Sequence, residues 1–201
     1  MKKDILIFGD SIAYGVGDPL LGGWVDLLKR YVWSIKSNLN VYNFCIDGNS
    51  TRDLLHRLSI QSAQTLYKKE AVFIAIGIND SVFYQDGTVF MNEMEFSDNM
   101  KKLIAQAKSF SENIYIVGIT AVDENITSPF ADSRTGKTYA NKRIQKFNAV
   151  LQEISASEGI KFISLFGLID VDADMFDGLH VNTKGQKKMF DKILGEVHFL
   201  K

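Results

Sequence analysis

Five short runs of apolar residues constrain the fold of this chain more than any other feature of its sequence. They occupy residues 5–8, 41–46, 71–76, 114–119 and 160–165. Within them the apolar residues are largely continuous and do not alternate strictly with polar ones. Such runs are typical of strands that are buried on both faces of a parallel sheet. The sequence therefore predicts a parallel sheet of five strands.

Amphipathic segments lie between these runs and after the last of them. Apolar residues recur at helical spacing in residues 100–110, 144–154 and 189–197, and residues 24–35 are apolar over a wide arc. We predict a capping box formed by Thr183 and Gln186 at the start of the last helix. A repeated strand-then-helix order predicts a doubly wound α/β domain with helices on both faces of the sheet.

Length and composition restrict the class of protein. The chain has 201 residues, of which 46% are hydrophobic, and this predicts one domain over residues 1–201. The 23 basic and 24 acidic residues nearly cancel and form no long basic run, so no nucleic-acid partner is expected. The single cysteine, Cys45, is expected in the core. With no secretory or membrane-spanning apolar segment, we expect a cytoplasmic protein that does not insert into a membrane. The sequence favours no particular oligomeric state.

Small and polar residues follow three of the predicted strands, and a fourth group precedes the last helix. The carboxyl ends of parallel strands meet at one edge of a sheet, where ligands bind in open α/β folds. The residues are Gly9, Asp10 and Ser11 after the first strand, Gly48 after the second, Gly77, Asn79 and Asp80 after the third, and Asp177 and His180 before the helix.

These residue types match the requirements of ester hydrolysis. A serine hydroxyl such as that of Ser11 needs a base to take its proton, and His180 is a suitable base. Asp177 lies three residues before His180, so its carboxylate can orient the imidazole ring within one turn. Gly48 allows a backbone N–H to approach a substrate closely, and Asn79 offers a side-chain amide. With the N–H of Ser11 they form a candidate oxyanion hole.

The four segments, in this order, resemble the sequence blocks of the SGNH hydrolase superfamily, the GDSL-type esterases and lipases. The resemblance spans nearly the whole chain and implies a flavodoxin-like three-layer α/β/α fold with strand order 2-1-3-4-5. It also implies that Ser11 is the nucleophile, His180 the base and Asp177 its orienting partner, with Gly48 and Asn79 in the oxyanion hole. The chain departs from many members at Val181, where they carry proline. The expected supporting residues are Asp10, Gly77 and Asp80.

The expected activity is hydrolysis of a small carboxylic ester through an acyl-enzyme, with no metal and no organic cofactor. Two polar loops, residues 81–97 and 121–138, are expected to border the site and to offer Phe83, Tyr84 and Phe130 to a substrate. Because the loops contain no extended apolar run, short acyl chains such as acetyl are favoured. The alternatives are a lysophospholipase or thioesterase for longer chains, acyl transfer to another alcohol, and a non-catalytic binding module on the same fold.

Overall fold

A five-stranded parallel sheet forms the centre of the computed structural model, which describes residues 1–35, 38–131, 133 and 135–200. The strand order is β2-β1-β3-β5-β7. Counted along the sheet's own strands, this is the expected order 2-1-3-4-5, and the prediction is confirmed. The strands are β1 (Lys3–Gly9), β2 (Leu39–Asn43), β3 (Lys68–Ala75), β5 (Ile114–Val117) and β7 (Lys161–Ile163).

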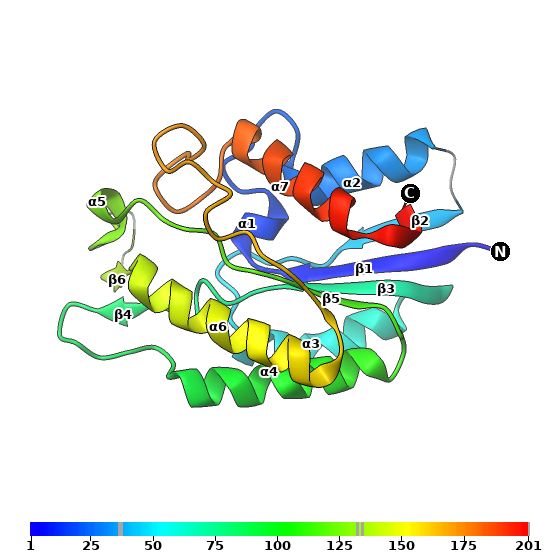
Figure 1. The fold of residues 1–201 in the computed structure, drawn as a ribbon, viewed down its shortest axis with the longest axis horizontal. Helices are drawn as coiled ribbons and strands as arrows, with labels where there is room; N and C mark the ends of the chain where they lie inside the picture. The colour runs from blue at the N-terminus through cyan, green and yellow to red at the C-terminus, as the bar shows by residue number, and fades with distance from the viewer. Residues whose placement is uncertain (36–37, 132, 134, 201) are drawn as a thin grey trace.

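The continuous apolar run of the first strand reflects burial on both sheet faces. Residues 5–8 of β1 are all 0% exposed, although successive side chains of a strand point to opposite faces. Helices cover both faces (Figure 1). One face carries α2 (Gly23–Ser34) and α7 (Thr183–Glu196), which contact each other. The other carries α3 (Thr51–Ala63), α4 (Glu93–Lys108) and α6 (Asn141–Glu158). The predicted three-layer architecture is confirmed.

Four of the five strands end earlier than their apolar runs predict. The ladders stop at Asn43, Ala75, Val117 and Ile163. Several apolar residues beyond these ends remain buried in the connecting segments, among them Cys45, Ile76, Ile119 and Leu165. An apolar run indicates that residues are buried and does not indicate that they pair with a neighbouring strand. The runs therefore overestimate the length of the strands.

The predicted capping box of α7 is wrong. Asn182 caps this helix, and its side-chain oxygen accepts hydrogen bonds from the N–H groups of Lys184 and Gly185. The Gln186 side chain instead donates to the carbonyl of Ile12 at 2.9 Å and accepts from the N–H of Trp24 at 2.9 Å. Gln186 therefore makes buried contacts with the first turns of α1 and α2 and does not cap its own helix.

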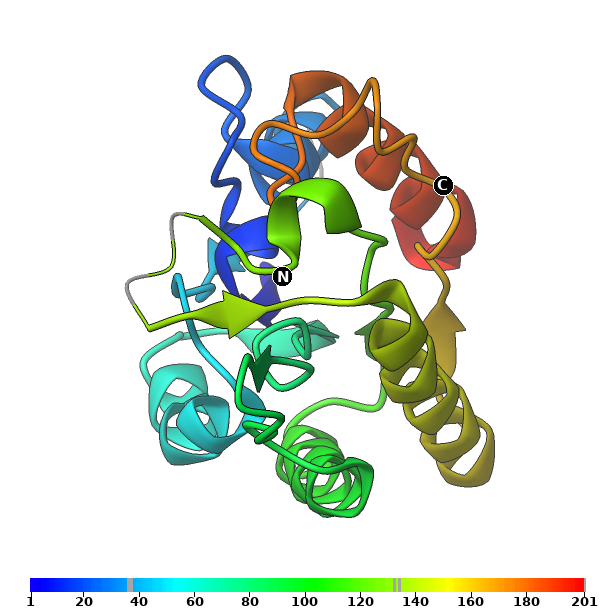
Figure 2. The ribbon, with the colours of Figure 1, turned by 90° about the vertical axis from the view of Figure 1, so that its left-hand side faces the viewer.

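Loops and short elements gather at the carboxyl edge of the sheet, which Figure 2 views end-on. They include α1 (Ser11–Tyr14), α5 (Glu124–Thr127) and a two-stranded antiparallel pair, β4 (Phe83–Tyr84) with β6 (Lys137–Thr138). The two loops that were expected to border the site are thus joined to each other. A short 3-10 helix, His198–Leu200, follows α7.

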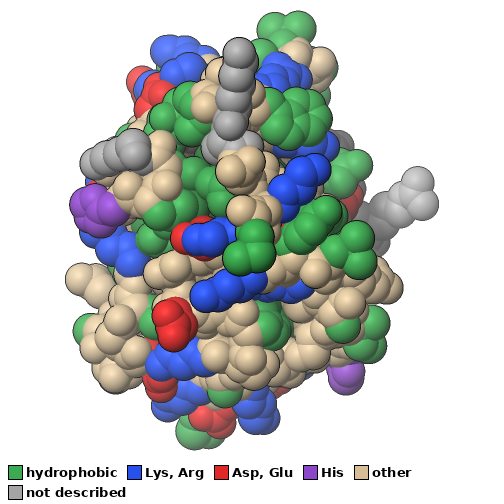
Figure 3. All heavy atoms as spheres, turned by 90° about the vertical axis from the view of Figure 1, so that its right-hand side faces the viewer, with side chains coloured by type: hydrophobic (Ala, Val, Ile, Leu, Met, Phe, Trp, Pro, Cys, Tyr) green, Lys and Arg blue, Asp and Glu red, His purple; other side chains and the backbone are tan. Residues whose placement is uncertain are grey.

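At the amino end of the sheet, basic and acidic side chains are interspersed with apolar ones over the face shown in Figure 3. This mixture of signs fits the formal net charge of -1. Within the described part of the chain, no helix combines the length and the apolar composition needed to cross a membrane.

Candidate active site

Ser11 lies at the junction of β1 and α1. β1 ends at Gly9, Asp10 caps the short helix, and Ser11 is the first helical residue. The ends of β1 and β3 lie close together here, since a Cβ atom on Gly9 would lie 2.6 Å from the carbonyl oxygen of Ala75. The Asp10 carboxylate accepts a hydrogen bond from the N–H of Ile12 at 3.1 Å. This geometry fixes Ser11 at the carboxyl edge of the sheet, where the residue is 4% exposed.

A tight turn before α7 brings His180 and Asp177 to the same edge. The Nδ1 atom of His180 lies 2.7 Å from the Oδ2 atom of Asp177, and its Nε2 atom lies 3.0 Å from the Oγ atom of Ser11. Gly178, with φ of 85°, makes the turn, and a Cβ atom there would lie 2.8 Å from Ile126. The structure therefore brings together a hydroxyl, an imidazole and a carboxylate in hydrogen-bonding sequence.

The second oxygen of Asp177 fixes its own turn. Oδ1 accepts from the N–H groups of Leu179 at 3.0 Å and His180 at 2.7 Å. Partial burial disfavours the charged carboxylate, but the hydrogen bonds from His180 outweigh it and lower the pKa of Asp177 below its ordinary value. Asp177 is therefore an anion at neutral pH. An anion on this side of the ring favours a proton on Nδ1 and leaves Nε2 free to accept one from Ser11.

Candidate donors for an oxyanion come from the segments after β2 and β3, which line the same cleft as Ser11. Asn79 follows β3, which pairs with β1, and its amide nitrogen donates to the carbonyl of Asn49 at 3.0 Å. Gly48 has φ of 73°, a conformation that glycine adopts readily. Among the described residues no group accepts a hydrogen bond from its N–H. This N–H and the second amide proton of Asn79 are therefore available to a ligand.

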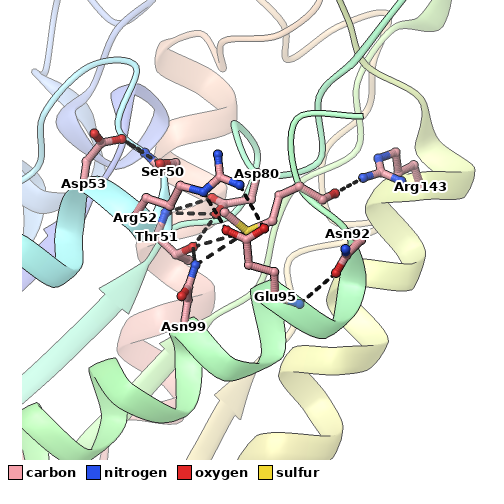
Figure 4. Close-up of polar contacts among 10 residues, drawn as sticks. Ser50, Thr51, Arg52, Asp53, Asp80, Asn92, Glu95, Asn99 and Arg143 are labelled. Carbon is pink, nitrogen blue, oxygen red and sulfur yellow. Dashed lines mark hydrogen bonds and ion pairs between the residues drawn. The ribbon is translucent and has the colours of Figure 1, made fainter. Parts of the chain in front are cut away.

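Asp80 connects the third strand end to the start of α3, as Figure 4 shows. It is 0% exposed and accepts hydrogen bonds from the N–H of Thr51 at 3.0 Å and from its hydroxyl at 2.5 Å. The Asn99 amide of α4 donates to the same hydroxyl at 3.1 Å. Burial raises the pKa of Asp80 to about 6, although the hydrogen bonds from Thr51 oppose the shift. Asp80 thus holds the segment that follows Gly48.

Asp10 is the second buried carboxyl group beside the site. Burial raises its pKa to about 7, and the hydrogen bond from Ile12 opposes this shift, while the nearby Asp80 carboxylate adds to it. The side chain of Asp10 caps α1, and within the described part of the chain it makes no hydrogen bond to another element. Gly77, the remaining supporting residue, has φ of 139°, and a Cβ atom there would lie 2.8 Å from Ile119.

A cleft of about 320 Å³ opens over the candidate triad. Of the three expected aromatic residues only Phe130 lines it. Phe83 lines a separate cleft with Val89 and Arg143, and Tyr84 lies in β4 outside both clefts. The cleft also contains residues that the sequence did not single out: Asp47, Ser133, Thr135, Lys137, Tyr139 and Leu179. Pairing of β4 with β6 brings Ser133, Thr135, Lys137 and Tyr139 to the cleft that contains Ser11, and no local sequence pattern signals a pairing over that distance.

Nothing among the described residues groups three His, Cys, Asp or Glu side chains as a metal site. Asp174, which lies near Asp177 in the sequence, pairs with Lys188 at 2.5 Å and with Lys184 at 3.4 Å. The side chains around Ser11 include a base that can take its proton and donors that can bind an oxyanion. That combination is the requirement for acyl transfer through a serine.

Comparison with known proteins agrees with this chemistry. Residues 7–188 match the model of the GDSL-like Lipase/Acylhydrolase family. Esterase TesA of Pseudomonas aeruginosa is 23% identical over 194 residues, which cover 95% of this chain and 86% of that protein. The crystal structure of the lipase/acylhydrolase from Enterococcus faecalis superposes with a TM-score of 0.77 at 25% identity, over 96% of this chain and 94% of that one. An acetyl xylan esterase from Geobacillus stearothermophilus superposes with a TM-score of 0.75 at 21% identity, over 98% of this chain and 95% of that one.

Proposed function

Because this chain belongs to the GDSL-like lipase/acylhydrolase family, it is an esterase or acylhydrolase, and we propose that it cleaves carboxylic esters through an acyl-enzyme on Ser11. The observation that supports this most directly is the pair of contacts made by His180. Its Nε2 atom lies 3.0 Å from Ser11 Oγ, and its Nδ1 atom lies 2.7 Å from Asp177 Oδ2. Both distances are within the reach required of a general base and of the group that orients it.

In the first half of the proposed reaction, Ser11 Oγ attacks the ester carbonyl carbon while His180 Nε2 takes its proton. The carbonyl oxygen becomes an oxyanion, which the N–H groups of Ser11 and Gly48 and the amide of Asn79 stabilise. Asp177 stabilises the imidazolium that forms. Collapse of the tetrahedral intermediate breaks the bond to the alcohol oxygen, and that oxygen receives the proton from His180. The acyl group remains on Ser11.

In the second half, water takes the place of the alcohol. His180 removes a proton from the water as it attacks the acyl-enzyme, and the second tetrahedral intermediate uses the same donors. Its collapse releases the carboxylic acid and returns the proton to Ser11 Oγ. If another alcohol reached the acyl-enzyme before water, the same steps would give acyl transfer.

For the substrate we propose short acyl chains, such as acetyl, on a polar alcohol. Charged and hydroxyl side chains make up much of the cleft wall, including Asp47, Ser133 and Lys137. Phe130 and Leu179 supply a limited apolar surface, which suits a small acyl group better than a long one. An acetyl xylan esterase is among the proteins with a similar fold. A lysophospholipase or thioesterase would need a longer apolar channel than these residues offer.

A series of nitrophenyl esters from acetyl to decanoyl tests both parts of the proposal. We expect kcat/KM to be highest for acetyl or butyryl and to fall with chain length. Ser11→Ala is expected to lose activity by about 10⁴-fold or more. Ser109→Ala is the matched control, because Ser109 is exposed at the end of α4. An optimum at octanoyl or decanoyl would contradict the acyl preference alone, whereas full activity of Ser11→Ala would contradict the nucleophile.

A further inference from the structure

We propose that Tyr139 is a positioning residue for the oxyanion site, whose buried hydroxyl holds the side-chain amide of Asn79 in the orientation that presents its nitrogen to a substrate. This inference rests on the proposed function of Asn79. It extends that function to a residue outside the four sequence segments that suggested the site. Tyr139 lines the same cleft as Ser11, Asn79 and His180.

The backbone of Tyr139 is fixed on both sides. Its N–H donates to the carbonyl of Thr127 at 3.0 Å, and the hydroxyl of Thr127 donates to its carbonyl at 3.3 Å. Tyr139 directly follows β6, which is paired with β4. Its ring meets the Phe130 ring edge-on, with centroids 6.0 Å apart. The side chain is therefore held from several directions, and this is the property that a positioning residue requires.

The buried hydroxyl of Tyr139 has one hydrogen-bond partner among the residues that the structure describes. The residue is 2% exposed, and its hydroxyl donates to Asn79 Oδ1 at 3.5 Å. A buried phenol hydroxyl normally has a hydrogen-bond partner, and among the described residues Asn79 is the partner found. Burial also raises the pKa of Tyr139 well above its ordinary value, so the hydroxyl keeps its proton and stays a donor throughout the working pH range.

The surrounding groups distinguish the oxygen from the nitrogen of the Asn79 side-chain amide. Its oxygen faces the donor hydroxyl of Tyr139, and its nitrogen donates to the carbonyl of Asn49 at 3.0 Å. A flipped amide would place its oxygen against the Asn49 carbonyl and leave both acceptors without a donor. The observed orientation therefore leaves the second proton on the nitrogen for the oxyanion.

The distance of 3.5 Å is long for a hydrogen bond between oxygens. Hydrogen bonds at catalytic sites are often long in the free enzyme and shorten in the transition-state complex. As Asn79 donates to a developing oxyanion, its carbonyl oxygen becomes a stronger acceptor for Tyr139, because hydrogen bonds in a chain polarise one another. The contribution of Tyr139 should consequently appear in kcat and leave KM nearly unchanged.

Tyr139→Phe removes only the hydroxyl and keeps the ring that packs on Phe130. We expect kcat for a nitrophenyl acetate to fall about fivefold to tenfold, which corresponds to ~1 kcal/mol, the net value of one hydrogen bond. Tyr31→Phe is the matched control, since Tyr31 also donates its hydroxyl within the protein, to the Leu200 carbonyl at 3.1 Å, on the opposite face of the sheet from α6. It should leave kcat unchanged. Thermal unfolding shows whether each variant is folded.

A double-mutant cycle shows whether Tyr139 influences kcat through Asn79. If Tyr139 acts through Asn79, Tyr139→Phe will cost nothing further in an Asn79→Ala background. A full-sized loss in that background, or wild-type kcat in the single variant, would overturn the inference. Asn79→Ala alone should cost about 10²–10³ in kcat. If it does not, the oxyanion role of Asn79 fails, and this outcome is distinct from a failure of Tyr139 alone.

A crystal structure of the wild-type enzyme bearing an alkyl phosphonate on Ser11 gives a second test that does not depend on a variant folding. We expect the amide nitrogen of Asn79 to face the phosphonyl oxygen and the Tyr139 hydroxyl to lie closer to Asn79 Oδ1 than 3.5 Å. A Tyr139 hydroxyl turned away from Asn79 in that complex would contradict the inference.

Discussion

The Nε2 atom of His180 lies 3.0 Å from the Oγ atom of Ser11, although the two residues are 169 positions apart in the sequence. The segments that carry these two residues meet because α7 packs beside α2, and Gln186 of α7 bridges the Ile12 carbonyl and the Trp24 N–H. The same packing that fixes α7 on the sheet therefore sets the distance between the proposed base and nucleophile.

Asp177→Asn should lower kcat by about 10⁴-fold while the fold is retained, since an amide at this position can stabilise the wrong tautomer of His180. The hydrogen bonds that Oδ1 accepts from Leu179 and His180 can survive in the variant, so its thermal unfolding should resemble that of the wild type. Steady-state kinetics with nitrophenyl acetate measures the loss. A variant with near wild-type kcat would show that the Asp177 carboxylate is not needed to orient the base.

Gly48→Ala should impair catalysis beyond its effect on stability. Gly48 has φ of 73°, and no heavy atom lies within 4 Å of a Cβ atom built there. The variant should therefore lose ~1–2 kcal/mol of unfolding free energy through backbone strain alone, and its N–H should shift from the oxyanion position. Urea denaturation and kcat together separate the two effects.

Gly159→Ala is the matched control for this variant. Gly159 caps the C-terminal end of α6 with φ of 66° and likewise has no heavy atom within 4 Å of a built Cβ. It should show the same loss of stability with an unchanged kcat. Equal kcat values for the two variants would count against the oxyanion role of Gly48.

Much of this candidate site could be predicted from the sequence because several of its residues come soon after apolar strands. Ser11 follows the apolar run of β1, and Asn79 lies just beyond that of β3, so a pattern that predicts strands also predicts their meeting at one edge. Asp177 and His180 are close in sequence, and one tight turn suffices to pair them. These relationships depend on local chain direction and on strand order.

The parts that the sequence did not reveal depend on long-range contacts. Gln186 was predicted to cap its own helix but bonds to Ile12 and Trp24 instead. Tyr139 was not singled out, because the position on which its proposed role depends follows from pairing of β4 with β6 across more than fifty residues. Local propensity carries no information on such a pairing. For the same reason Phe83, expected at the substrate, lies in a separate cleft.

Asp10→Asn should make the protein more stable at neutral and alkaline pH. The pKa of Asp10 is about 7 in the folded chain against an ordinary value of 3.8. Between these values the folded chain holds a proton that the unfolded chain has lost, so the free energy of unfolding falls as pH rises through this window. Asparagine carries no charge, and its side-chain oxygen can still accept from Ile12.

Urea unfolding of the wild type and of Asp10→Asn at several pH values from 3 to 8 checks this expectation. The stability of the variant relative to the wild type should increase across the window by up to ~4 kcal/mol, a figure that follows from about three pKa units at 1.36 kcal/mol each. A difference that is constant over the whole pH range would contradict the account of Asp10.

Labelling with a nitrophenyl alkylphosphonate tests the central claim, that Ser11 is the nucleophile, most directly. The reagent transfers its phosphonyl group to an activated serine, and digestion with mass spectrometry locates the product. We predict one phosphonyl group per chain, on Ser11, formed in parallel with the loss of esterase activity, and no labelling of Ser11→Ala. A label on another residue, or full inactivation with Ser11 unmodified, would contradict the account.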